Sequence, residues 1–197
     1  LLFGHLPSKS EFQQWTTDVT HHRRIKFRII DLLKCLPEAG HPMDALQAAV
    51  AALGMFYPGR NVKDVENNYW SAVRLVAKLP TIVAAWARLR HGDDPIPPRD
   101  DLGFSENFLY MLTESAAPPL WSEIFDDCLI LHAEHTMNAS TFTGLVTAST
   151  LADPYTVVAS SIGALKGPLH GGANEEVVVM LKEIGTPDKA RPFVERA

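Results

Sequence analysis

Apolar residues recur at intervals of three or four positions along almost the whole sequence, and this period constrains the fold more than any other feature. Such an interval places apolar side chains on one face of a helix. No segment between turn signals alternates between apolar and polar residues, as a half-buried strand would. The sequence therefore predicts an all-α, multi-helical protein with little or no β structure.

Capping residues, prolines and glycines predict the helix ends. Ser8 and Glu11 have the spacing of a capping box, and the helix that they open should turn Phe12 and Trp15 inward. Ser105 is expected to be the N-cap of a later helix. Further helices are predicted over the ranges 25–36, 42–53, 62–90, 105–112, 119–135, 138–151, 153–166 and 173–184.

Several of these segments have special features. Pro80 lacks the amide donor of a helix interior, so it should kink the 62–90 helix or divide it into two abutting helices. Residues 91–101 contain three prolines and are expected to form an exposed loop, the best candidate for a linker. An apolar stripe in 119–135 predicts an inward face. The segments 138–151 and 153–166 are rich in small residues, which favours close helix pairing.

Composition limits the function. The chain has 197 residues, is 46% hydrophobic and has a net charge of −5, which favours small-molecule partners over nucleic acid or a membrane. Cys35 and Cys128 lack the spacing of a zinc ribbon and indicate a reducing, cytoplasmic compartment. No stretch is long and apolar enough to span a bilayer. Because Leu1 is not Met, we expect the chain to begin inside a longer parent.

His170 lies in the motif GPLHGGANEEV, between a Gly-Pro break and a predicted helix. The unpaired amides and positive dipole end of that helix would disfavour an imidazolium, so we expect a neutral ring that donates a hydrogen bond to a carbonyl group. Gly171 and Gly172 would let a ligand approach the backbone closely. The pattern alone also fits a histidine in a flexible turn.

Other histidines form weaker patterns. His132 and His135 are three residues apart and should share the apolar face of one helix, where a buried structural role is the commonest outcome. Their spacing does not match a zinc protease, and no second Glu-x-x-His pair suits a di-iron bundle. The basic cluster 21–24 fits a solvated face, and we assign it no role.

Four segments resemble citrate synthases in order and spacing: HPMDAL (41–46), SENFLYML (105–112), ILHAEHTMNAST (130–141) and GPLHGGANEEV (167–177). The GGANEEV sequence in the last segment is more similar to prokaryotic members of that family. The resemblance covers essentially the whole chain. It implies an all-α homodimer with a large and a small domain. Residues 1–197 would be most of the large domain, the small domain would begin near 171–197, and its remainder would be absent.

The resemblance also implies site residues. His170 matches the histidine that stabilises the enol of acetyl-CoA, and His135 matches one that binds oxaloacetate. Asn138 would line the oxaloacetate pocket, and His132 would support the structure. Main-chain groups of Leu169 and Gly171 are candidates for the thioester end of CoA. No metal or cofactor is implied, and acetyl-CoA is a substrate.

In the family, the catalytic base, a further histidine and several arginines follow the GPLHGGAN motif. Here no histidine follows His170, and only Arg191 and Arg196 supply guanidinium groups. The sequence therefore predicts a citrate synthase segment that is inactive by itself. One alternative is a non-catalytic helical module that serves assembly. Another is 2-methylcitrate synthase, because propionyl-CoA differs from acetyl-CoA by one methylene.

Overall fold

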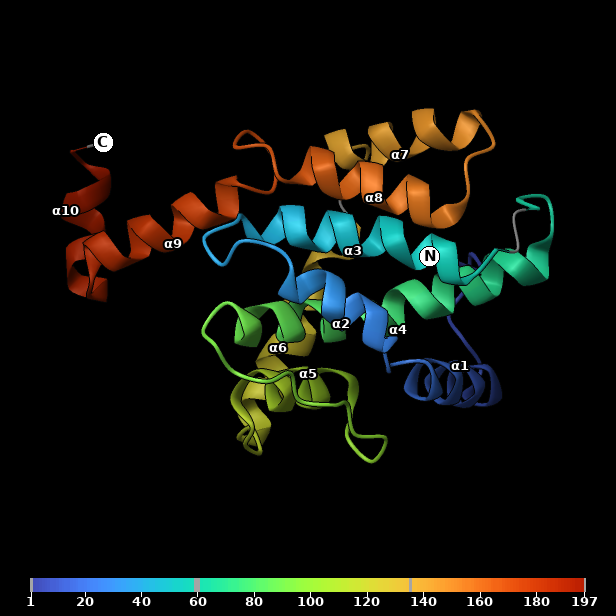
Figure 1. The fold of residues 1–197 in the computed structure, drawn as a ribbon. Helices are drawn as coiled ribbons and strands as arrows, with labels where there is room; N and C mark the ends of the chain where they lie inside the picture. The colour runs from blue at the N-terminus through green and yellow to red at the C-terminus, as the bar shows by residue number, and fades with distance from the viewer. Residues whose placement is uncertain (1, 59–60, 135, 197) are drawn as a thin grey trace.

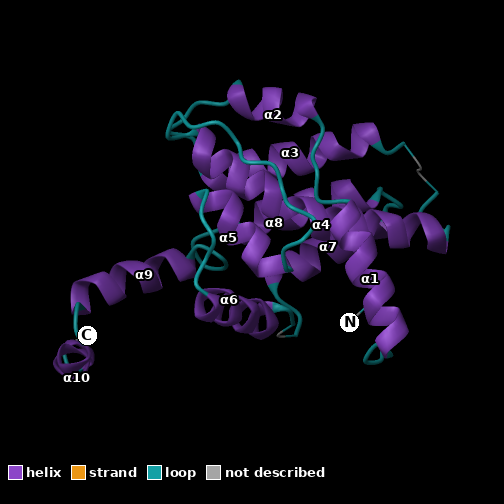
Figure 2. Ribbon diagram, turned by 90° about the horizontal axis from the view of Figure 1, so that it is seen from below, coloured by secondary structure: helices purple, strands orange, loops and turns teal. Residues whose placement is uncertain are grey.

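The computed structural model describes residues 2–58, 61–134 and 136–196, and all regular structure within them is helical. The predicted all-α class is therefore confirmed. The elements are α1 (Lys9–His21), α2 (Phe27–Lys34), α3 (Pro42–Phe56), α4 (Val65–Leu89), α5 (Phe104–Thr113), α6 (Pro119–His132), α7 (Ala139–Ser149), α8 (Pro154–Leu165), α9 (Ala173–Ile184), the 3₁₀ turn η1 (Pro187–Lys189) and α10 (Ala190–Val194). In Figures 1 and 2, α9 and α10 project away from the other helices.

The main core lies where α2, α3, α4 and α8 meet. Apolar side chains from one face of each helix point into it, as the helical period predicts. The buried cluster comprises Ile29, Leu33, Ala45, Ala49, Val50, Leu53, Leu75, Ile82, Ala85, Trp86, Tyr155, Ala159 and Ile162. Burying one of the larger aliphatic side chains in this cluster, such as valine, leucine or isoleucine, contributes about 1.5–3 kcal/mol to stability. The core therefore holds α3 and α8 firmly against each other.

The predicted capping box at the start of α1 is confirmed. The Glu11 N–H donates to Ser8 Oγ at 3.3 Å, and the Ser8 N–H donates to Glu11 Oε2 at 2.7 Å. Trp15 turns inward and packs on a small cluster between α1 and α4. The inward prediction is wrong for Phe12, which is 59% exposed. Phe12 lies about one helical turn nearer the N-terminus than Trp15, and the cluster between α1 and α4 does not extend to it.

Helix α4 passes through Pro80 without a break. The alternative of two abutting helices is therefore wrong. A proline inside a helix costs about 3 kcal/mol relative to alanine. The residues around it, including Ala77, Thr81 and Ile82, are buried against the rest of the molecule, so tertiary packing keeps the two halves in one helix.

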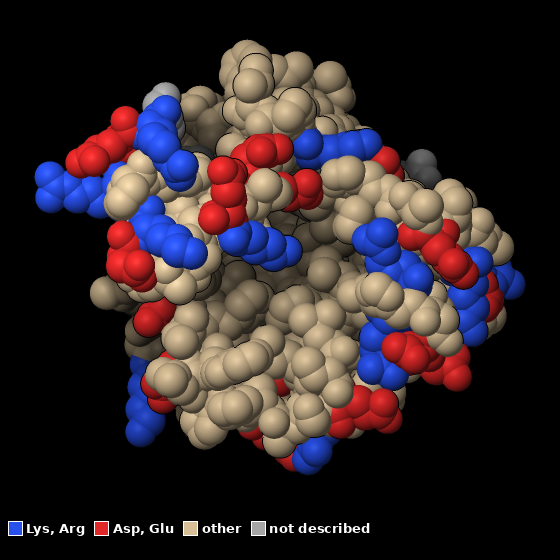
Figure 3. Space-filling model, turned by 90° about the vertical axis from the view of Figure 1, so that its left-hand side faces the viewer, with Lys and Arg blue, Asp and Glu red and all other residues tan. Residues whose placement is uncertain are grey.

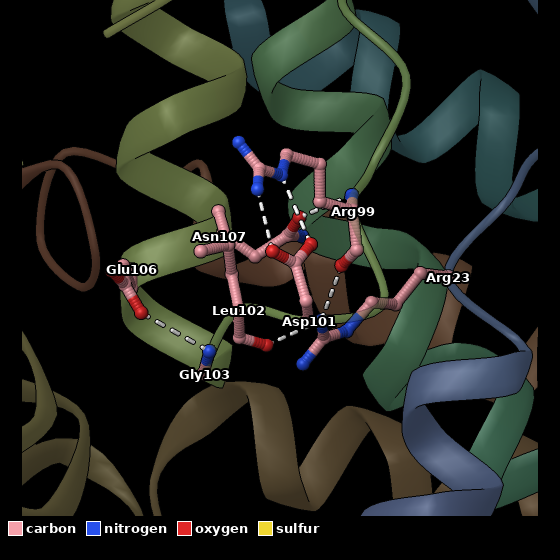
Figure 4. Close-up of polar contacts among 7 residues, drawn as sticks. All are labelled: Arg23, Arg99, Asp101, Leu102, Gly103, Glu106 and Asn107. Atoms are coloured by element: carbon pink, nitrogen blue, oxygen red, sulfur yellow. Dashed lines mark hydrogen bonds and ion pairs between the residues drawn. The ribbon is translucent and has the colours of Figure 1, made fainter. Parts of the chain in front are cut away.

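The basic cluster 21–24 is not a solvated face throughout, because Arg23 is only 3% exposed. Its Nη1 donates to the carbonyl oxygens of Arg99 at 2.9 Å and Leu102 at 2.8 Å (Figure 4). The Arg99 N–H donates to Asn107 Oδ1 at 2.8 Å. The segment 91–101 is mostly an exposed loop, as predicted, but Arg23 and Asn107 fasten its end to the helices, so it is not a free linker.

The prediction that Ser105 is the N-cap of α5 is wrong. Gly103 occupies that position, and its N–H donates to Glu106 Oε2 at 3.3 Å. Ser105 lies in the first turn, is 1% exposed, and donates its hydroxyl proton to Asp126 of α6. Because the Glu106 carboxylate satisfies the free amide, the serine hydroxyl joins α5 to α6 instead.

The prediction of an inward apolar face on α6 is also wrong within this chain. No described residue of α6 is buried, and Trp121 and Ile124 are 61% and 52% exposed. Phe125 stacks on Phe108 of α5, with ring centroids 5.0 Å apart. The apolar period predicts the helix correctly, but the described residues do not cover most of its apolar side.

Helices α7 and α8 form the close pair that their small residues predict. A Cβ atom added at Gly144 would lie 2.7 Å from Ser161 Oγ. Asp153 ends the turn between them by accepting from the N–H groups of Tyr155 and Thr156 at 3.0 and 3.1 Å. The hairpin brings the start of α7 and the end of α8 to the end of the molecule where α3 also begins (Figure 1).

Candidate active site

His170 lies in a tight turn between the end of α8 and the start of α9. Its N–H donates to the Gly167 carbonyl at 2.9 Å, and the Gly172 N–H donates to the same oxygen at 3.1 Å. A Cβ atom at Gly171 would lie 2.7 Å from Leu165 Cδ1, so a larger residue would displace the turn. The imidazole is therefore presented from a closely packed backbone.

The first turn of α7 contacts the His170 ring. Ser140 Oγ lies 2.9 Å from His170 Nε2, and the Ser140 main-chain N–H donates to the same nitrogen at 3.3 Å. Because a backbone N–H can only donate, Nε2 is assigned as the acceptor and the ring proton lies on Nδ1. Among the described residues, Nδ1 has no hydrogen-bond partner, so its proton is available to a ligand.

The His170 ring contacts the first turn of α7 and not the helix that follows it. We predicted that the helix after His170 would disfavour the imidazolium, but the amide that contacts the ring belongs to α7. The His170 carbonyl oxygen instead accepts from the Ala173 N–H at 3.2 Å, at the start of α9. The imidazole faces one helix N-terminus while the main chain of the same residue leads into another.

Asn138 is the N-cap of α7. Its Oδ1 accepts from the Thr141 N–H at 2.8 Å and lies 2.7 Å from Ser140 Oγ. The serine hydroxyl therefore has two acceptors within reach, Asn138 Oδ1 and His170 Nε2. Asn138 is half-buried beside the imidazole and orients the helix turn that holds it. Its predicted role in lining a substrate pocket stays a prediction.

The structure places the other predicted residues less centrally. His132 is exposed at the last residue of α6, where its Nδ1 donates to the Cys128 carbonyl at 2.6 Å, so its expected burial is wrong. His135 lies outside the described residues. The Leu169 side chain is 99% exposed, and Gly171 is half-buried in the turn. Their contacts with CoA stay predictions.

Ser140 is the residue of the candidate site that the sequence analysis missed. The spacing of Asn138 and Thr141 matches an N-cap and its third helical residue, which places Ser140 in the first turn. That signal locates the serine at a helix N-terminus. It does not reveal the contact with His170, 30 residues further along the chain. The contact depends on the α7–α8 pairing.

The described residues contain no cluster of three or more histidine, cysteine or acidic side chains that could hold a metal ion. None of the helices in the described part of the chain is both long and apolar enough to span a bilayer.

The fold and this site define a class: an all-helical protein in which a glycine-rich turn presents an imidazole to the first turn of a neighbouring helix. The family model "citrate synthase, C-terminal domain" matches residues 1–197. A citrate synthase from Synechocystis sp. is 56% identical over 196 residues, covering 100% of this chain and 49% of that protein. Citrate synthase 2 of Bacillus subtilis is 44% identical over 190 residues, covering 96% and 51%.

Solved structures agree. The crystal structure of citrate synthase from Pyrobaculum aerophilum matches with a TM-score of 0.87 and 44% identity, covering 98% of this chain and 50% of that chain. The Thermotoga maritima enzyme matches with a TM-score of 0.82 and 36% identity, covering 100% and 51%. The chain belongs to the citrate synthase family, and its predicted likeness to prokaryotic members is confirmed. It spans about half the length of the curated relatives it matches.

Proposed function

We propose that the protein containing this chain is a citrate synthase, which condenses acetyl-CoA with oxaloacetate and hydrolyses the product to citrate and CoA. The observation that carries this proposal is the His170 ring. Its Nε2 accepts from the main chain of Ser140, which leaves the Nδ1 proton free to meet a ligand oxygen. The family membership supplies the reaction in which such a donor is needed.

The chemistry explains why a neutral donor suits this step. Removing a proton from the methyl group of a thioester places negative charge on the carbonyl oxygen. A preorganised hydrogen bond to that oxygen stabilises the charge as it develops. His170 provides the Nδ1–H donor, while Ser140 holds the opposite nitrogen and limits rotation of the ring. The ring acts by its position.

The other substrate contacts follow from the family resemblance. His135 binds oxaloacetate, and Asn138 shapes that pocket from the start of α7. The main-chain groups of Leu169 and Gly171 meet the thioester end of CoA. The reaction needs no metal or other cofactor. The protein acts as a cytoplasmic homodimer, with residues 1–197 as most of the large domain and the small domain beginning near 171–197.

A direct test is CoA release from acetyl-CoA and oxaloacetate by the full-length protein, followed with a thiol reagent. His170→Gln should lower kcat by about 10²–10³-fold, the usual loss when an oxyanion donor is removed. His91→Gln is the matched control, because His91 is exposed in the loop after α4. Its kcat should stay within about twofold, as for most surface substitutions.

Two outcomes would contradict the proposal. Turnover of propionyl-CoA in clear preference to acetyl-CoA would favour 2-methylcitrate synthase, and no thiol release from either substrate would favour a non-catalytic assembly module. The 197-residue polypeptide should release no CoA in the same assay, because the base and the arginine clamps expected from the family are not among its residues. Substantial turnover by that polypeptide would refute this last expectation.

A further inference from the structure

The start of α3 reaches the His170 turn on the side of α8. Lys166 is the C-cap of α8 and directly precedes Gly167, where the turn begins. Its Nζ lies 2.7 Å from both carboxylate oxygens of Asp44, in the first turn of α3. The ion pair therefore joins α3 to the last residue before the turn that carries His170.

A second contact from α3 lies on the other side of the same turn. His41 is the N-cap of α3, and its Nδ1 accepts from the Met43 N–H at 3.1 Å. The ring proton is therefore assigned to Nε2, which lies 3.7 Å from Glu175 Oε1 in the first turn of α9. His41, the N-cap of α3, and Asp44, in its first turn, thus face the residues on either side of the His170 turn.

These contacts surround a cavity of about 230 Å³ at the junction of α3 with the turn. Figure 3 shows this end of the molecule, where acidic and basic side chains lie around a hollowed surface. Its lining residues are His41, Met43, Leu165, Lys166, Gly171, Gly172, Asn174 and Glu175. The charged side chains of Lys166 and Glu175 therefore border open space beside the turn.

Helix α3 is a firm support for such contacts. Ala49, Val50 and Leu53 are fully buried in the main core. A Cβ atom at Gly163 of α8 would lie 2.6 Å from Gln47 Nε2, so α3 and α8 approach each other closely just before the turn. The position of Asp44 is therefore set by the core, and the ion pair transmits that position to Lys166.

We propose that Asp44 and Lys166 are positioning residues that set where the His170 imidazole lies against Ser140. The inference rests on the proposed role of His170 as the enol-stabilising donor. The Asp44 and Lys166 side chains are 54% and 37% exposed, and exposed ion pairs contribute only about 0–1 kcal/mol to stability. The pair acts on the geometry of the turn, where a displacement of about 1 Å can lower a rate about 10²-fold.

The test uses the full-length protein with Asp44→Asn, Lys166→Met and the exchange of both residues, Asp44→Lys with Lys166→Asp. We expect each single variant to lower kcat about three- to fivefold, near the limit set by the energy of an exposed ion pair, and to leave the KM for acetyl-CoA within about twofold. The exchanged pair should restore most of the loss. Melting temperatures should stay close to that of the unchanged protein, as expected for an exposed pair.

The matched control is Glu195→Gln, which breaks the exposed Arg191–Glu195 ion pair in the separate α10 region. A second readout is independent of activity: the imidazole ¹⁵N shifts of His170, assigned by their loss in His170→Gln. The single variants should shift the Nε2 signal away from its hydrogen-bonded value, and Glu195→Gln should not.

The proposal is overturned if both single variants have the same kcat and the same His170 ¹⁵N shifts as the Glu195→Gln control. It is also overturned if the exchanged pair restores neither the kcat nor the shifts of the unchanged protein. Failure of the proposed function looks different. In that case the unchanged protein releases no CoA, while the ¹⁵N shifts still report whether the ion pair positions the ring.

Discussion

At the scale of single residues, two buried cations, Lys78 and Arg23, bind main-chain carbonyl groups of neighbouring segments. Lys78 of α4 is 4% exposed, and its Nζ donates to the carbonyl oxygens of His22 and Arg24, each at 2.5 Å. Thr81 donates to the carbonyl of Arg23, at 2.9 Å, and Arg23 in turn binds the loop before α5. These contacts join helix α4 to the α1–α2 connection, and the connection to the loop before α5.

Replacing Arg23 should destabilise the protein strongly. Burial lowers the pKa of its guanidinium, and the nearby Asp100 charge opposes that shift. Arg23→Met would leave the carbonyl oxygens of Arg99 and Leu102 without the donor that Arg23 supplies. We therefore expect a loss of about 2–4 kcal/mol in the free energy of unfolding, measured by urea titration. Arg24→Met is the control, because Arg24 is exposed, and should change it by less than about 0.5 kcal/mol. Equal effects of both substitutions would contradict the assigned role.

Lys78 predicts a dependence of stability on pH. Burial, together with the positive charges of Lys26 and Arg74, lowers its pKa from 10.5 to about 8 in the folded protein. Between these values the unfolded chain binds more protons than the folded chain, so the free energy of unfolding should rise with pH across this window. Below about pH 8, both states carry the proton and the penalty of burying the charge is complete.

The measurement compares the unchanged protein with Lys78→Met, which has no group to titrate at this position. The difference between their unfolding free energies should increase from about pH 8 towards about pH 10.5 in favour of the unchanged protein. A difference that stays constant over this window would show that Lys78 does not titrate there.

At the scale of helices, local signals predict most ends correctly. Proline and glycine end α2 near Pro37 and begin α3 at Pro42, and the break at Gly167 separates α8 from α9. The failures occur where a distant contact overrides a local one. Ser105 has the preferred chemistry of an N-cap, but its hydroxyl binds Asp126 of another helix. Pro80 has the chemistry of a helix break, but the core on both sides keeps α4 continuous.

The α7–α8 pair offers a prediction at this scale. Gly144→Ala should destabilise the protein by about 1 kcal/mol, because overlap of the new Cβ with Ser161 Oγ outweighs the better helix propensity of alanine. In a Ser161→Ala background the oxygen is gone. There the same substitution should stabilise the protein by up to about 1 kcal/mol. Thermal unfolding of the four proteins measures this change of sign, and an unchanged sign would contradict the assigned close approach.

At the scale of the whole molecule, burial is concentrated in a few helices. Helices α3 and α4 supply many of the buried side chains, whereas no described residue of α6 or α9 is buried. A helical apolar period predicts that a face is covered but not by which atoms. This explains why the class and most helices could be predicted, while the inward faces of α6 and the burial of Arg23 could not.

In the candidate site, too, local sequence patterns predict some residues, whereas others are revealed only by the packing of distant segments. His170 could be predicted because glycine, proline and acidic residues around it form a recognisable local pattern. The role of Ser140 could not be predicted, since its position beside the imidazole depends on how α7 and α8 pair. Asp44 and Lys166 are 122 residues apart in the chain, and no local pattern links them.

Ser140, at the start of α7, and His170, just after α8, meet at the open end of one helical hairpin, whose helices have 11 and 12 residues. The lengths of the two helices thus determine whether Ser140 and His170 meet. One inserted residue in either helix would advance it by about 1.5 Å and rotate it by about 100°, turning one side of the contact away. An insertion in the connection at 150–153, at the far end, would leave both in register. Tolerated length changes between these residues should therefore gather at that connection.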